Sequence, residues 1–258
     1  LGYFNQMHAE GVFLNKFVSI ALLSAFCDKE ALMNAKHIHA FIYASGLERD
    51  TFVATAILSM YSKCLSVSNA LSTFEKMVNR DLVAWNAMLS AYVEAKLHQN
   101  AFEHFREMQR FASISPSKVT FLCILESCGC LASLEKGKYI HRLVLARKLH
   151  EDLSVANAMI NMYSKCSMLQ KALEVFEELP VRDVVSWSAL IDGYVENGRS
   201  AEAIKCFRKM EEEGIHPNAV TYICVLKGCA IIGSLEVGEE IHTELRAEGL
   251  LKNNAMLG

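Results

Sequence analysis

The chain has 258 residues, of which 52% are hydrophobic and 21% charged, and its formal net charge at pH 7 is −3. This composition argues against extended disorder, and no run of 18 apolar residues exists that would predict a transmembrane helix. Nor is there the basic surplus typical of nucleic-acid-binding domains. No signal or transit peptide is visible, but the chain opens on Leu1 rather than Met, so we expect a preceding segment to be missing.

Nine cysteines are present, an odd number without the regular spacing of a disulfide framework. Most of them lie in apolar windows such as FLCILESCGC and YICVLKGCA. The sequence therefore predicts free, buried thiols in a reducing compartment.

Helical periodicity is the dominant pattern, and it comes in pairs of short stripes. From residue 51 the first stripe recurs at spacings of 3, 4 and 7 and consists of Val53, Ile57, Met60, Tyr61 and Cys64. After a break the second stripe consists of Val67, Ala70, Leu71, Phe74 and Met77. Glycine and proline separate such pairs: Gly214 is suited to end a helix and Pro217 cannot continue one.

The same pattern returns about 100 residues later. MYSKC occurs at 60–64 and again at 162–166, within 51–81 and 153–183, which align without a gap. In chain order we divide the sequence into a tail of a preceding unit, seven units, and the start of a further unit: 1–15, 16–50, 51–81, 82–117, 118–152, 153–183, 184–218, 219–253 and 254–258. Two-helix units bury their stripes only against neighbours, so we predict one all-α solenoid domain, whose hand the pattern leaves open.

Units such as VVSWSALIDGYVENGRSAEAIKCFRKMEEEGIHPN resemble pentatricopeptide repeats, and the order of unit lengths is similar to the P, L and S motifs of plant PLS-class members. The L units are 16–50, 118–152 and 219–253; the S units are 51–81 and 153–183; the P units are 82–117 and 184–218. The resemblance implies a right-handed superhelix of about seven repeats. Tetratricopeptide repeats are the nearest alternative, but they keep a uniform period of about 34 residues.

The resemblance also implies a binder of single-stranded RNA that reads about one base per unit through the fifth and last residues of each unit, facing a concave groove. The four implied readers are Thr55 with Asp81 for G, Asn86 with Ser117 for C, Asn157 with Asp183 for U, and Ser188 with Asn218 for A. The L units pair an aliphatic fifth residue with a polar last residue and should discriminate weakly: Ile20 with Asp50, Leu122 with Asp152, and Ile223 with Asn253. The expected core is 5′-N-G-C-N-U-A-N-3′.

The chemistry of these pairs is consistent with that reading. An ionised Asp only accepts hydrogen bonds, which suits the ring N–H of G and U, whereas Asn and Ser can donate to the bare ring nitrogen of A and C. The second residue of each unit would sandwich the base, and Ser154 offers the poorest such surface. The better sandwiching residues are Phe52, Val83, Val119, Val185 and Val220.

Several of these residues also have a plainer interpretation. Taken alone, Asp81 and Asp183 read as helix N-caps. The recurring His39, His141 and His242 are expected to pack between helices, since one His per unit cannot converge on a metal, and Trp85 and Trp187 are expected in the core. Lys63 and Lys165 suit phosphate contacts or solvent equally well.

No catalytic motif is evident, so we expect no enzyme activity, cofactor or metal site. HAE at 8–10 and HTE at 242–244 echo the H-x-E of zinc deaminases, but no C-x-x-C accompanies them. P-loop, G-x-G-x-x-G and G-x-S-x-G patterns are absent from the sequence as well. Editing chemistry would have to come from a C-terminal extension or from a deaminase supplied in trans.

Two other functions compete with RNA reading. A solenoid can present its surface to proteins as a scaffold, or serve as a structural part of an organellar ribonucleoprotein such as the ribosome. Acidic residues such as Glu211, Glu212 and Glu213 fall in second helices. We expect second helices to lie on the convex face, so a neutral or basic concave face would favour RNA and an acidic one would favour the scaffold. By resemblance we expect a mitochondrial or chloroplast RNA-processing factor, most often for C-to-U editing, with single-stranded RNA and editing proteins as partners and no membrane or small-molecule ligand.

Overall fold

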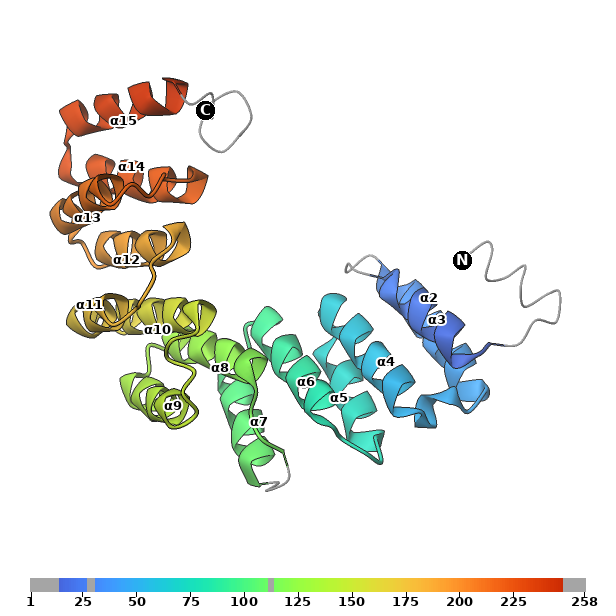
Figure 1. Ribbon diagram of the computed structural model, residues 1–258. Helices are drawn as coiled ribbons and strands as arrows, with labels where there is room; N and C mark the ends of the chain where they lie inside the picture. The colour runs from blue at the N-terminus through green and yellow to red at the C-terminus, as the bar shows by residue number, and fades with distance from the viewer. Residues whose placement is uncertain (1–13, 27–30, 111–113, 248–258) are drawn as a thin grey trace. The chain divides into compact units, whose positions relative to one another are not determined.

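The computed structural model describes residues 14–26, 31–110 and 114–247. These residues form α-helices joined by turns, with one short 3-10 segment at Leu47–Arg49 and no strand among them, which confirms the all-α prediction (Figure 1). The helices of the first three units are α2 (Lys16–Ser24), α3 (Leu32–Ala44), α4 (Thr51–Lys63), α5 (Val67–Lys76), α6 (Leu82–Glu94) and α7 (His98–Arg110). Those of the remaining units are α8 (Lys118–Cys130), α9 (Leu134–Ala146), α10 (Leu153–Lys165), α11 (Leu169–Glu177), α12 (Val184–Glu196), α13 (Ser200–Glu212), α14 (Ala219–Ile232) and α15 (Leu235–Ala247). Of the predicted tail 1–15, residues 1–13 lie outside this description, as does 254–258.

The chain divides into two compact bodies, an N-terminal body (1–127) and a C-terminal body (128–258), with the boundary inside α8. Within the N-terminal body the first helices of successive units pack side by side, α2 on α4 and α4 on α6. A second helix such as α5 contacts both its own first helix and the next one. The C-terminal body repeats this arrangement with α10, α12 and α14 as first helices and α11 and α13 beside them (Figure 1).

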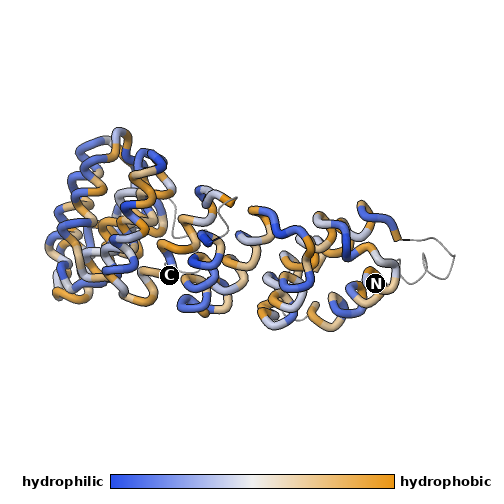
Figure 2. Tube along the Cα trace, turned by 90° about the horizontal axis from the view of Figure 1, so that it is seen from below, coloured by the Kyte–Doolittle hydropathy of each residue, from blue (hydrophilic) through white to orange (hydrophobic). Residues whose placement is uncertain are grey.

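Burial explains why the units stack. The stripe residues of α4 predicted above are all buried, as are Phe74 and Met77 after it. Hydrophobic segments recur along the whole drawn trace rather than gathering in one part of it (Figure 2). Removing one such side chain from water stabilises the fold by about 1.5–3 kcal/mol, so the core is distributed over all the helix pairs.

An arginine near the end of each S unit makes two contacts with a phenylalanine, and this phenylalanine packs against the next helix. Arg80 Nε donates to the Phe74 carbonyl oxygen at 3.0 Å, and Arg182 Nε donates to that of Phe176 at 3.1 Å. Each guanidinium also lies 5.0 Å from the centroid of the same phenylalanine ring. This ring packs edge-on against the buried tryptophan of the following helix, with centroids 4.9 Å apart for Trp85. Trp85 and its counterpart Trp187 are thus core residues, as predicted.

The prediction that the cysteines are free is confirmed for the described residues, but the prediction that they are buried holds only for some of them. All eight cysteines in the described part of the chain are free, and Cys64, Cys128, Cys224 and Cys229 are buried. Cys130, however, is exposed because it is the last residue of α8, where the helix meets solvent. No helix in the described part of the chain is long and apolar enough to span a bilayer.

Candidate nucleic-acid interface

In five of the units the last residue is the N-cap of the next first helix: Asp50, Asp81, Asp152, Asp183 and Asn218. Asp81 Oδ1 accepts the backbone N–H of Ala84 at 2.9 Å, and Asp183 Oδ1 accepts that of Ser186 at 2.8 Å. Asp50 and Asp152 cap α4 and α10 in the same way. The N-cap interpretation of Asp81 and Asp183 is therefore correct. It does not compete with base recognition, because the cap uses one carboxylate oxygen and leaves Oδ2 without a hydrogen bond among the described residues.

The cap also decides which polar atom the last residue has left. Asn218 Oδ1 accepts both the backbone N–H and the hydroxyl of Thr221, each at 3.0 Å. With its oxygen held by the cap, the Asn218 side chain has only its Nδ2 donor group left for a ligand. A capping Asp instead has an acceptor left. The same helix-start geometry thus converts an Asp-to-Asn difference into an acceptor-to-donor difference.

In unit 82–117 the structure brings the predicted pair into direct contact. Asn86 Nδ2 donates to Ser117 Oγ at 3.1 Å. Thr120, a residue that the sequence did not single out, donates its hydroxyl to Asn86 Oδ1 at 2.7 Å, and its oxygen accepts the Ser117 backbone N–H at 3.0 Å. The three side chains form one hydrogen-bonded cluster.

In unit 184–218 a threonine again joins the pair. Ser188 Oγ lies 2.7 Å from Thr221 Oγ1, and Thr221 in turn bonds to Asn218. The Ser188 hydroxyl also lies 2.7 Å from the Val184 carbonyl oxygen, one turn earlier in α12. Thr120 and Thr221 are each the third residue of their unit. Both of these units directly follow a P unit, so the threonine recurs at the same place in the repeat.

The S-unit pairs are not joined in this way in the described residues. Thr55 Oγ1 donates to the Thr51 carbonyl oxygen at 2.8 Å and has no hydrogen bond to Asp81. Asn157 is buried, and its Oδ1 atom has no hydrogen-bond partner within the part of the chain that the structure describes. A buried amide oxygen without a partner costs free energy, and this cost is relieved when a ligand supplies a donor.

In the L units the fifth residues are aliphatic and half-buried: Ile20, Leu122 and Ile223. Their side chains have no hydrogen-bonding atom, so any polar discrimination by these units would rest on the last residue alone. Asn253 lies outside the described residues.

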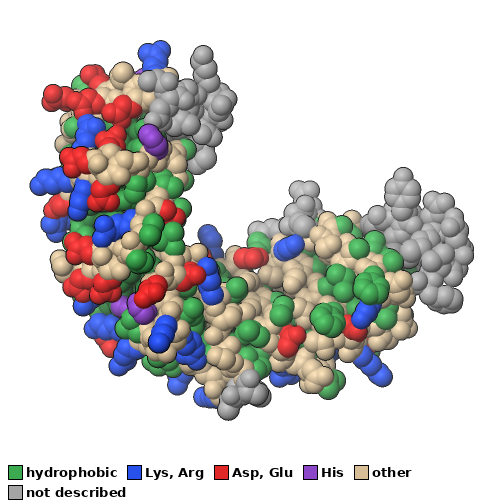
Figure 3. All heavy atoms as spheres, viewed as in Figure 1, with side chains coloured by type: hydrophobic (Ala, Val, Ile, Leu, Met, Phe, Trp, Pro, Cys, Tyr) green, Lys and Arg blue, Asp and Glu red, His purple; other side chains and the backbone are tan. Residues whose placement is uncertain are grey.

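The second residue of each unit is apolar and yet exposed. The five predicted sandwiching residues are 49–70% exposed: Phe52, Val83, Val119, Val185 and Val220. Phe17, in the same position of unit 16–50, is 73% exposed and was not singled out from the sequence, although its position carries the signal. Lys16 Nζ lies 5.4 Å from the Phe17 ring centroid and 5.8 Å from that of Phe52. Exposed hydrophobic side chains are visible over the N-terminal body in Figure 3.

Charge is distributed unequally between the first and second helices. The first helices carry five lysines and four acidic residues: Lys16, Lys63, Lys118, Lys165 and Lys227, and Glu94, Glu126, Asp192 and Glu196. Most other helical charges lie on second helices, and Figure 3 shows Lys, Arg, Asp and Glu side chains gathered over α11, α13 and α15. The first helices are therefore close to neutral, although the whole chain has a net charge of −3.

The recurring histidines differ from one another. His39 Nδ1 lies 2.8 Å from the Tyr61 hydroxyl, and His141 Nδ1 lies 2.7 Å from that of Tyr163. Burial lowers the pKa of both imidazoles and raises the pKa of Tyr61 to about 12, so these two pairs are neutral packing contacts, as predicted. The packing prediction is wrong for His242, which is exposed on α15; no further helix packs on that face among the described residues.

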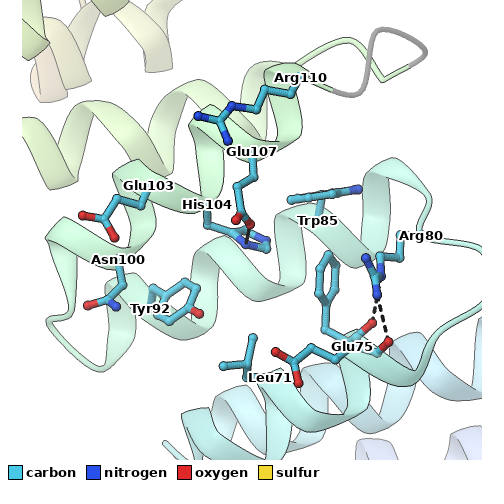
Figure 4. A pocket seen from close by; sticks show the side chains of 11 residues that line it. Leu71, Glu75, Arg80, Trp85, Tyr92, Asn100, Glu103, His104, Glu107 and Arg110 are labelled. Atoms are coloured by element: carbon cyan, nitrogen blue, oxygen red, sulfur yellow. Dashed lines mark hydrogen bonds and ion pairs between the residues drawn. The ribbon is translucent and has the colours of Figure 1, made fainter.

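A cavity of about 560 Å³ lies between α5, α6 and α7 in the N-terminal body (Figure 4). Phe74, Trp85, Tyr92 and His104 form its aromatic wall, and none of the predicted reading residues lines it. Burial, with a smaller effect of Arg80, lowers the pKa of His104 to about 4. His104 is therefore neutral near pH 7, and its 3.8 Å approach to Glu107 is not an ion pair there.

Comparison with known proteins identifies the repeats. Residues 52–82 and 154–184 match the PPR repeat, and residues 80–130 and 182–231 match the PPR repeat family. Similar proteins of Arabidopsis thaliana include pentatricopeptide repeat-containing proteins At3g57430, chloroplastic (32% identical over 93% of this chain and 28% of the relative), and At2g03380, mitochondrial (34%, 98% and 36%). The chloroplastic protein CRR2 is 35% identical over 93% of this chain and 37% of its own. The chain thus spans about a third of the length of these relatives.

Among solved structures, the pentatricopeptide repeat protein PPR10 in complex with an 18-nt psaJ RNA element superposes with a TM-score of 0.81. The match covers 96% of this chain and 37% of PPR10 at 21% identity, which confirms the α-solenoid fold. The chloroplastic and mitochondrial names of the relatives support the organellar location expected from the sequence. The chain belongs to the pentatricopeptide repeat family.

Proposed function

We propose that this chain is an RNA-recognition segment of an organellar RNA-processing factor and reads single-stranded RNA at about one base per unit. The observation that carries the proposal is the capping geometry: Asp81, Asp183 and Asn218, the last residues of three of the four S and P units, are each held by one polar atom and keep another for a ligand. The solved PPR10 complex, in which a protein of the same fold binds an 18-nt RNA element, supports the choice of partner.

The proposed readout follows from donors and acceptors. In units 51–81 and 153–183, Asp Oδ2 accepts a ring N–H, which G and U have and A and C lack. In units 82–117 and 184–218, Ser117 and Asn218 donate to a bare ring nitrogen, which selects C and A. The fifth residue then separates purine from pyrimidine: Thr55 and Ser188 are short, while Asn86 and Asn157 reach further.

Stacking supplies the part of the affinity that does not depend on sequence. Apolar second residues of successive units, such as Phe52 and Val83, would hold a base between them. The near-neutral first helices place no large negative charge against the phosphates, and they carry five lysines. The assignment of the units to the PLS class, the core 5′-N-G-C-N-U-A-N-3′ and a role in C-to-U editing are parts of this proposal. The deamination itself would be supplied by another segment or protein.

The test is a binding titration at a fixed, stated salt concentration. One short RNA carries the G-C-N-U-A core, and a second has G exchanged for A and U for C. The double variant Asp81→Asn, Asp183→Asn is titrated with both. Each lost edge contact should cost on the order of 1–3 kcal/mol, by analogy with base readout in DNA. Both Asn residues still cap a helix, so the variant should stay folded.

The chain should prefer the first RNA, and the double variant should prefer the second. Equal binding of both RNAs by the chain and by the variant would overturn the proposed code. Negligible binding of either RNA, together with a folded helical spectrum, would favour a protein-binding scaffold or a structural place in a ribonucleoprotein.

A further inference from the structure

Each P unit ends beside a buried threonine that belongs to the next unit. Thr120 and Thr221 are completely buried and stand third in α8 and α14. Neither position is a fifth, last or second residue, so neither contributes to the proposed code. Both hydroxyls nevertheless bond to the reading pair of the preceding unit.

Proton bookkeeping shows what Thr120 does. A hydroxyl has one proton, and the Thr120 oxygen already accepts the Ser117 backbone N–H. Its proton goes to Asn86 Oδ1, 2.7 Å away, rather than to Ser117 Oγ, which lies 3.3 Å away. With Oδ1 occupied, the Asn86 amide is fixed with Nδ2 toward Ser117, to which it donates one of its two protons.

This orientation matters because an amide has two chemically different ends. Held by Thr120, the Asn86 side chain has a second Nδ2 proton left, and the pair offers donors to an approaching base. Cytosine has acceptors at N3 and O2, whereas uracil has a donor at N3. If the amide turned over, Oδ1 would lie where the donor stands, and the preference for cytosine over uracil would be lost.

The S units, whose last residue is an Asp, differ from the P units in this respect. Ser186 stands third in α12, as Thr120 does in α8, and donates its hydroxyl to Asp183 Oδ1 at 2.9 Å. The two oxygens of a carboxylate are both acceptors, so turning it over changes nothing that a base would detect. The first copy has Ala84 at this position and no hydroxyl.

We propose that Thr120 and Thr221 are positioning residues for base recognition: Thr120 fixes the donor orientation of Asn86 beside Ser117, and Thr221 fixes that of Asn218 by donating to its Oδ1. This inference rests on the proposed function, because orientation has a consequence only if the pairs read bases. The effect is larger for Thr120, since Asn86 is not itself a helix cap. Asn218 is additionally oriented by the Thr221 backbone N–H.

The experiment compares Thr120→Val, which keeps the branched shape and removes the hydroxyl, with Thr120→Ser, which keeps the hydroxyl. Each is titrated with two RNAs that differ only in C or U opposite unit 82–117. The chain and Thr120→Ser should favour C by about tenfold or more, and Thr120→Val by about threefold or less. Ser186→Ala, titrated with U or C opposite unit 153–183, is the matched control and should keep its preference for U. Thermal unfolding of each variant checks that the fold is intact.

Full retention of the preference for C by a folded Thr120→Val would overturn the positioning role and leave the proposed function standing. Loss of preference in Ser186→Ala as well would also overturn it, since orientation should not matter for a carboxylate. If the unaltered chain fails to distinguish C from U and U from C, the proposed function falls, and the positioning role falls with it.

Discussion

The two copies of the S–P pair of units, 51–117 and 153–218, share their scaffold contacts and differ where a ligand would be read. Both have the arginine that bonds to a phenylalanine carbonyl, the buried tryptophan, and an Asp cap between the S and P units. The proposed reading pairs differ in their hydrogen bonds: Asn86 bonds directly to Ser117, whereas Ser188 reaches Asn218 only through Thr221. Comparing equivalent positions of the two copies thus distinguishes residues with a shared structural role from residues that differ at the proposed site. A few core positions also differ between the copies.

The largest expected difference concerns position 104, which is His in the first copy and Cys206 in the second. Burial lowers the pKa of His104 from the ordinary 6.5 to about 4. Between these pH values the unfolded chain binds the proton and the folded chain does not. The contribution of neutral His104 to the free energy of unfolding is therefore fully present above about pH 6.5. It is lost as the pH drops toward 4, which lowers the free energy of unfolding by on the order of 3 kcal/mol.

Urea unfolding at pH 7 and pH 4.5 measures this loss. His39 and His141 also have lowered pKa values, but they titrate in both proteins when the chain is compared with His104→Cys. The variant, which copies the second repeat, should lose less stability on acidification. An identical loss in the two proteins would show that His104 is not buried in its neutral form.

A second difference is a close helix approach in the second copy. A Cβ atom on Gly193 would lie 2.2 Å from Ser164 Oγ and 2.8 Å from Ser164 Cβ. The first copy has Ala91 at this position, where the Ser62 hydroxyl is turned to Glu94. Gly193→Ala should therefore destabilise the fold by roughly 2 kcal/mol through overpacking. The reciprocal change Ala91→Gly should cost about 1 kcal/mol, chiefly through helix propensity. Urea midpoints of both variants test this order, and a neutral or stabilising Gly193→Ala would contradict it.

A third experiment separates the capping role of Asp183 from its proposed role in base reading. Asp183→Ala removes the cap and should lower the free energy of unfolding by roughly 1–2 kcal/mol. Asp183→Asn keeps the cap and should cost less than half of that while changing the preferred base. If both variants lose equal stability, capping is not what Asp183 contributes to the fold. Chemical unfolding and RNA titration of the same two proteins provide the comparison.

The smallest expected effect compares the second residues. Phe52 is 70% exposed, whereas its counterpart Ser154 has no ring to stack on a base. Ser154→Phe should tighten RNA binding by about 1 kcal/mol, or roughly fivefold in Kd, and Phe52→Ser should weaken it by a similar factor. Neither exposed substitution should shift the thermal midpoint appreciably. Unchanged affinity in both would remove these positions from the interface.

Sequence periodicity predicted the helical fold well because each pair of helices is a local pattern repeated many times. The stripe from Val53 to Cys64 and the core placement of Trp85 both follow from spacing and apolarity. The location of Cys130 and His242 at the surface did not follow, because exposure depends on which helix packs next.

For the candidate site, the sequence indicates positions, which stay a prediction, and does not indicate the hydrogen bonds between them. A repeat alignment indicates the fifth and last residues, but it cannot show that Thr120 lies against Asn86, 34 positions earlier in the chain. It also does not show which oxygen of Asp81 the helix uses. These are properties of side-chain orientation, which the alignment does not contain.

If the last residue reads a base as proposed, its capping role limits how such a protein can change its target over evolutionary time. Residues that start a helix well are few, chiefly Ser, Thr, Asp and Asn. Mutational drift at Asp81, Asp183 or Asn218 is therefore confined to a small set of side chains if the following helix is to persist. Within that set an Asp-to-Asn exchange reverses the hydrogen-bonding sense and leaves the helix start intact. New specificities would then arise by single codon changes, without an intermediate that fails to fold.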